Sequence, residues 1–61
     1  MTLYQVNYTN RLQEMLNLII NKYGFEHGRT IAFAREVEKR KEQANYTNRE
    51  YMERLFKGWM R

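Results

Sequence analysis

The side chains that could perform acid–base or metal chemistry are few in this chain. His27 is the one histidine, the acidic residues are seven glutamates, and serine, aspartate and cysteine do not occur. A Ser-His-Asp or Cys-His arrangement therefore cannot be built, and a metal site would depend on His27 and glutamates. His27 has no partner at triad or metal-ligand spacing. We predict a protein that is not an enzyme, with no catalytic, cofactor-binding or metal-binding residues and no small-molecule substrate.

Basic residues dominate the charge. Eleven Lys and Arg residues against seven glutamates give a formal net charge of +4 and a sequence pI of about 9.7, which suits an acidic partner such as nucleic acid. Part of this charge is explained by pairs with Glu four residues before a basic residue, the favoured order on a solvated helix face. These pairs are Glu36–Arg40, Glu50–Arg54 and Glu53–Lys57. The other cations could contact phosphates only if the fold gathers them on one side.

A repeated pentapeptide indicates where helices begin. Asn7-Tyr8-Thr9-Asn10-Arg11 recurs as Asn45-Tyr46-Thr47-Asn48-Arg49, and each copy precedes a stretch with helical apolar spacing. Thr47 and Glu50 have the Thr-x-x-Glu spacing of a capping box, in which each side chain caps a free backbone N–H of the other residue. We predict that the two copies mark two helix starts.

The elements that must position these residues are three helices, predicted at residues 8–23, 30–44 and 47–60. Apolar residues from Leu12 to Tyr23 form one helical stripe, and Gly24 is the predicted stop. Thr30 is the predicted cap of the second helix, and Asn45 ends it in a left-handed conformation. The third helix has one broad apolar face and is the most clearly amphipathic.

These segments predict one small all-α domain over residues 1–61, a three-helix bundle with short connections. The predicted core consists of Leu12, Met15, Leu16, Ile19, Val37, Leu55, Phe56 and Trp59. A domain of this size buries a modest share of its surface, and disulfides are excluded by the lack of cysteine. Self-association is therefore the expected support for the fold.

The sequence contains no apolar run of membrane-spanning length and no segment that resembles a signal peptide. We expect a cytoplasmic protein without a membrane partner.

Apolar side chains beyond the predicted core favour protein binding. The predicted partner-binding residues are Leu18, Ile20, Phe33 and Met60. We expect a small regulatory or inhibitory protein that docks an amphipathic helical surface onto a partner protein, with a homodimer as the expected assembly.

The alternative hypothesis is a small basic DNA-binding protein. The second and third helices would form a helix-turn-helix-like arrangement, and the predicted nucleic-acid-binding residues are Asn48, Arg49, Arg54 and Lys57. Two features argue against this hypothesis. The polar run from 38 to 43 makes the second helix longer than is typical, and the broad apolar face of the third leaves a narrow exposed strip.

Overall fold

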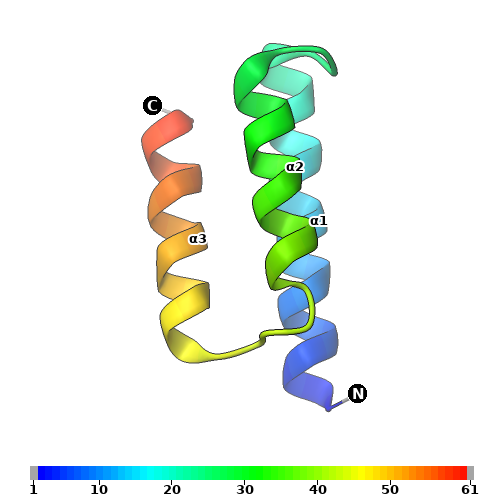
Figure 1. Ribbon diagram of the computed structural model, residues 1–61, viewed down its shortest axis with the longest axis vertical. Coiled ribbons are helices and arrows are strands. Elements are labelled where there is room, and N and C mark those ends of the chain that lie inside the picture. Colours follow the sequence, from blue (N-terminus) through cyan, green and yellow to red (C-terminus); the bar gives the residue numbers. More distant parts are fainter. Residues whose placement is uncertain (1, 61) are drawn as a thin grey trace.

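The computed structural model describes residues 2–60, and within them the chain forms three helices. These are α1 (Leu3–Tyr23), α2 (Gly28–Arg40) and α3 (Tyr46–Trp59). Helices α1 and α2 form an antiparallel hairpin, and α3 runs alongside it in the direction opposite to α2 (Figure 1). The predicted all-α three-helix bundle is confirmed. None of the helices in this part of the chain is long and apolar enough to span a membrane.

Helix α1 begins at Leu3 rather than at residue 8. The Thr2 hydroxyl oxygen accepts a hydrogen bond from the backbone N–H of Gln5 at 3.2 Å, and the Gln5 side chain accepts one from the backbone N–H of Thr2 at 2.9 Å. This reciprocal capping box starts the helix before the first copy of the repeat, so the prediction that this copy marks a helix start is wrong. The predicted stop at Gly24 is confirmed, since its φ of 95° suits a residue without a Cβ atom.

Helix α2 is capped by His27 and not, as predicted, by Thr30. Nδ1 of His27 accepts a hydrogen bond from the backbone N–H of Arg29 at 3.0 Å. Thr30 is buried instead, and its hydroxyl donates to the carbonyl oxygen of Gly24 at 2.6 Å. The helix ends at Arg40 rather than at residue 44, because the polar run from 38 onward has no apolar side chain that could anchor a further turn to the core.

Asn45 begins α3 and does not end α2 in a left-handed conformation. Its φ is −124°, and its side-chain oxygen accepts a hydrogen bond from the backbone N–H of Asn48 at 2.9 Å. Thr47 lies inside the first turn, so the predicted capping box of Thr47 and Glu50 is wrong. The second copy of the repeat does mark a helix start, with Asn45 as its cap.

The core lies where the three helices meet. Its buried apolar residues are Tyr8, Leu12, Met15, Ile19, Phe33, Val37 and Met52. Four of the predicted core residues are therefore confirmed as fully buried, and the other four are partly buried and pack against them: Leu16, Leu55, Phe56 and Trp59.

Contacts at the middle and at the C-terminal end of α3 join it to α1. At the middle of α3, Arg11 and Glu53 form a salt bridge at 2.8 Å. At the C-terminal end, Lys22 donates a hydrogen bond to the carbonyl oxygen of Trp59 at 3.1 Å, and the Tyr23 hydroxyl donates to the same oxygen. These contacts hold α3 on one side of the hairpin.

Candidate protein-binding groove

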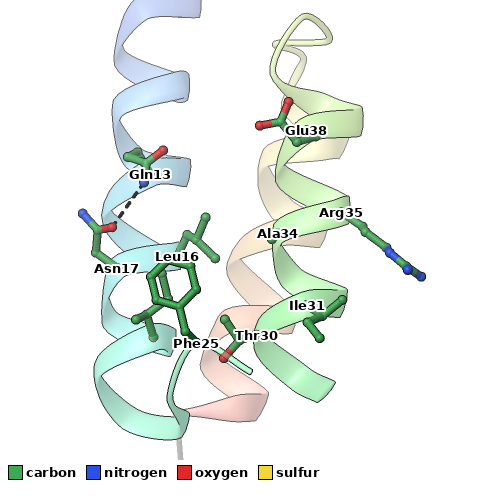
Figure 2. Close-up of a pocket in the computed structure, with 10 residues that line it drawn as sticks. Gln13, Leu16, Asn17, Phe25, Thr30, Ile31, Ala34, Arg35 and Glu38 are labelled. Atoms are coloured by element: carbon green, nitrogen blue, oxygen red, sulfur yellow. Dashed lines mark hydrogen bonds between the residues drawn. The ribbon is translucent and has the colours of Figure 1, made fainter. Parts of the chain in front are cut away.

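A groove of about 520 Å³ lies between α1 and α2. Its lining comes from these two helices and the connection between them, with no residue from α3 (Figure 2). We call it the α1/α2 groove. It lies on the side of the hairpin that α3 leaves open.

Helical spacing explains why the hairpin has this second side. On α1 the groove residues stand at 13, 16, 17 and 20, next to the core stripe at 12, 15 and 19. On α2 they stand at 30, 31, 34, 35 and 38, overlapping the core stripe of 30, 33 and 37. Each helix therefore carries an apolar stripe wider than the core uses. Helix α3 covers one flank of this stripe, and the groove is the other flank.

The apolar lining is exposed to solvent. Leu16, Ile20 and Ala34 are partly buried, whereas Phe25 and Ile31 are 76% and 45% exposed. The Phe25 ring reaches from the loop end of the hairpin toward Leu16, between the helices (Figure 2). Full burial of a large apolar side chain stabilises an association by about 1.5 to 3 kcal/mol. The groove can therefore contribute binding energy.

The polar residues of the groove lie along its edges. The Gln13 amide donates to the side-chain oxygen of Asn17 at 3.2 Å on the α1 edge (Figure 2). On the α2 edge, Glu38 forms a surface ion pair with Lys41 at 3.1 Å. Arg35 extends from α2 away from α1 (Figure 2) and has no hydrogen bond or ion pair within residues 2–60. The lining thus contains one cation and one anion.

The four predicted partner-binding residues do not form one surface. Ile20 lines the groove, while Leu18 is exposed on α1 outside it, and Met60 is partly buried against the core. The prediction that Phe33 adds exposed apolar surface is wrong, because this residue is fully buried.

The burial of Phe33 has a clear cause. The ring of Phe56 lies 6.4 Å from that of Phe33, and the ring of Trp59 lies 5.8 Å from it, both measured between centroids. Helix α3 supplies both of these rings. Sequence analysis missed Phe25 and Ile31 as binding residues. Phe25 is a large apolar residue in a mostly polar connection, which was a visible signal, whereas Ile31 begins an apolar stretch and gave none.

The predicted nucleic-acid-binding residues occupy the exposed face of α3. Arg49, Arg54 and Lys57 are exposed around a shallow depression of about 320 Å³, together with Tyr46 and two glutamates. Asn48 is not part of this depression. Its side-chain amide donates to the carbonyl oxygen of Gln43 at 2.7 Å, which places it in the start of the helix.

Glutamates reduce the positive charge of this face. Glu50 and Glu53 both line the depression. The hydrogen bond from Arg11 is the main cause that lowers the pKa of Glu53, with smaller contributions from nearby cations that include Lys57 and Arg49. Glu53 therefore stays charged among the three cations. Of the three i, i+4 pairs predicted from the sequence, Glu36–Arg40 forms in the structure, whereas the salt-bridge partner of Glu53 is Arg11.

Helices α2 and α3 do not have the steep crossing of a helix-turn-helix. They lie alongside each other in opposite directions (Figure 1), whereas the two helices of that motif meet at about 90 to 120° after a turn of three or four residues. The helix-turn-helix-like arrangement expected from the sequence is not what α2 and α3 form.

Within residues 2–60, no three His or Glu side chains gather in a way that could hold a metal ion. Comparisons of the chain with protein-family models, with curated proteins and with solved structures find no match. The arguments about function therefore come from the α1/α2 groove and the exposed face of α3.

Proposed function

We propose that this protein is a small non-catalytic binding module that acts by docking its α1/α2 groove onto an apolar helix of a partner polypeptide. The observation that supports this proposal is the groove itself, whose lining contains the exposed side chains of Phe25 and Ile31. Clustered exposed apolar side chains commonly mark interaction sites. A groove between two antiparallel helices suits a third helix, which packs its own side-chain ridge into it.

The edges of the groove define the chemistry of the partner. Arg35 and Glu38 give the lining no net charge, and the other edge carries the amides of Gln13 and Asn17. A strongly acidic or basic helix would gain little there, because attraction to one charged residue is offset by repulsion from the other. The favoured partner presents apolar residues flanked by amides or by both signs of charge. A regulatory or inhibitory effect would follow from covering that surface of the partner.

Site-specific photo-crosslinking tests this function. A photoreactive phenylalanine analogue is placed at Ile31, in the groove lining, and in a matched variant at Tyr46, which is 72% exposed on α3. After irradiation in the producing cells, position 31 should give a discrete protein adduct that position 46 does not give. Adding Phe25→Ser should abolish that adduct. No adduct at position 31, or the same adducts at both positions, would contradict the proposal.

A second candidate function is DNA binding by the exposed face of α3, without a helix-turn-helix. The observation in its favour is the row of Arg49, Arg54 and Lys57 along one face, since such cations contact phosphates without reading sequence. Titration of labelled duplex DNA at two salt concentrations tests it. The double variant Arg54→Ala/Lys57→Ala should bind more weakly and with a flatter salt dependence, and Arg35→Ala is the matched control. Absence of binding at low salt would exclude this candidate.

A further inference from the structure

We infer that the polypeptide in the α1/α2 groove is a second copy of this chain, so that two hairpins pack face to face in a homodimer. This inference rests on the proposed function, because it names the partner of the same groove. Charge and shape support a second copy, and the size of the face determines how strong the contact can be.

Charge distribution separates the groove from the rest of the molecule. The chain has a formal net charge of +4, whereas the groove lining contains Arg35 and Glu38 and no other charged residue. Two copies that met through α3 would bring Arg49, Arg54 and Lys57 toward the same cations of the other copy. The two glutamates of that face offset these three cations only in part. Contact through the groove brings together two surfaces without net charge, and like-charge repulsion there is avoided. The groove is therefore the favourable face for self-association.

The shape of the groove suits contact with its own copy. In a two-fold dimer the same patch of each subunit meets itself, so the patch must contain both projections and recesses. Phe25 and Ile31 are the exposed apolar side chains of this face, and the groove itself, with the small side chain of Ala34 in its lining, is the recess. The amides of Gln13 and Asn17 each contain donors and acceptors, so they can also pair with their counterparts.

The size of the face predicts a weak dimer. The 13 residues of α2 span about 20 Å, and two packed helices give a face roughly 20 Å wide, or roughly 400 Å² in projection. Standard stable interfaces bury about 800 Å² of accessible surface per partner. We therefore expect dissociation at micromolar concentration. Even such a weak contact would support a small domain that lacks disulfides.

Two charge reversals test the dimer without any assumption about its register. In Arg35→Glu the groove face carries two carboxylates, and in Glu38→Arg it carries two cations. Each variant alone should raise the dissociation constant at least about tenfold in sedimentation equilibrium. The reason is that two groove faces with the same sign of charge then meet and repel each other. An equimolar mixture of the two variants should restore association as a heterodimer. A mixture that remains monomeric, while the wild type is dimeric, would overturn the inference.

A pair of aromatic variants tests the location of the contact. Phe25 and Tyr46 are 76% and 72% exposed, on the groove and on α3 respectively, so neither substitution should prevent folding. Phe25→Ser should weaken the dimer, and Tyr46→Ser should leave it unchanged, with circular dichroism confirming equal helix content. Equal effects of the two variants would overturn the inference.

The dimer and the broader proposed function fail in different ways. A wild-type protein that stays monomeric up to millimolar concentration would overturn the dimer. If position 31 then crosslinks to a different protein, the proposed function is retained without the second copy. If position 31 gives no adduct at all, both are overturned. An adduct of twice the chain mass, formed at position 31 and not at position 46, supports both.

Discussion

Arg11 of α1 holds Glu53 of α3 through two parallel hydrogen bonds. Nε of Arg11 donates to Oε1 of Glu53 at 2.8 Å, and Nη2 donates to Oε2 at 3.2 Å. The flat guanidinium matches the carboxylate in this geometry, which makes the pair stronger and more directional than a single ion contact. The guanidinium carbon also lies 5.6 Å from the centre of the Phe56 ring. The pair therefore fixes α3 against α1 at the middle of α3.

This pair predicts a pH dependence of stability. The hydrogen bond from Arg11 lowers the pKa of Glu53 below its ordinary value of 4.5, so the unfolded chain takes up this proton first as the pH falls. The stabilisation is present above that ordinary value and is lost as the pH falls through the lowered pKa. Glu53→Gln should cost about 1 kcal/mol at neutral pH in urea unfolding. The difference should shrink as the pH falls below 4.5 and vanish once the pH is below the lowered pKa of Glu53.

Glu14→Gln is the matched control for this experiment. Glu14 contacts Arg11 at 3.3 Å, but its side chain is 64% exposed. Its removal should change the free energy of unfolding by less than about 0.5 kcal/mol. The same pH profile in Glu53→Gln as in the wild type would contradict the assigned role of Glu53.

The start of α3 makes a second prediction. Because Asn45 caps the helix and Thr47 lies exposed in its first turn, the two substitutions by alanine should differ. Asn45→Ala should cost about 1 kcal/mol of unfolding free energy, since a backbone N–H loses its acceptor. Thr47→Ala should be within about 0.5 kcal/mol of the wild type, because alanine has the higher helix propensity. A larger loss of unfolding free energy in Thr47→Ala than in Asn45→Ala would contradict this assignment and support the capping box expected from the sequence.

The repeated pentapeptide shows how far the sequence could predict this fold. Helical periodicity is a local property, and it correctly predicted three helices and four of the seven buried apolar residues of the core. The structural role of each copy of the repeat depends instead on tertiary packing. Tyr8 is 4% exposed in the second turn of α1, whereas Tyr46 is 72% exposed at the start of α3, although both stand in the same pentapeptide. The Thr2-x-x-Gln5 spacing was a visible capping signal that would have placed the first helix start correctly.

The groove could not be predicted in the same way, because it depends on which flank of the hairpin α3 covers. Phe33 and Phe25 are both large apolar residues near the start of α2. The rings of Phe56 and Trp59 bury Phe33, and no residue of α3 reaches the groove in which Phe25 lies. Such long-range packing leaves no signal in the spacing of either helix.

Two tyrosines predict opposite effects of the same substitution. The Tyr8 hydroxyl is buried without a hydrogen-bond partner among residues 2–60, and burial raises the pKa of this group. Tyr8→Phe removes an unpaired polar group, so unfolding free energy should stay the same or rise by about 1 kcal/mol. The Tyr23 hydroxyl accepts a hydrogen bond from Arg29 at 2.8 Å and donates to the carbonyl oxygen of Trp59. Tyr23→Phe should therefore cost about 1 kcal/mol.

Thermal or urea unfolding of the two variants under identical conditions measures this contrast. The tertiary contacts of the Tyr8 ring are kept in Tyr8→Phe, so a change in packing does not confuse the result. A loss of more than about 1 kcal/mol in Tyr8→Phe would show that its hydroxyl has a partner in solution.

Phe33 and Phe25 give the clearest separation of folding from binding. Phe33 is fully buried between helices, so Phe33→Ala should cost about 3 to 5 kcal/mol, a large part of the stability available to a 61-residue domain. Circular dichroism should show a much reduced helix content. Phe25→Ala removes a ring that is 76% exposed, and at low micromolar concentration it should change the free energy of unfolding by less than about 0.5 kcal/mol. If Phe25→Ala unfolded the monomer as Phe33→Ala does, the Phe25 ring would belong to the core, and the groove would lose the projecting side chain on which docking depends.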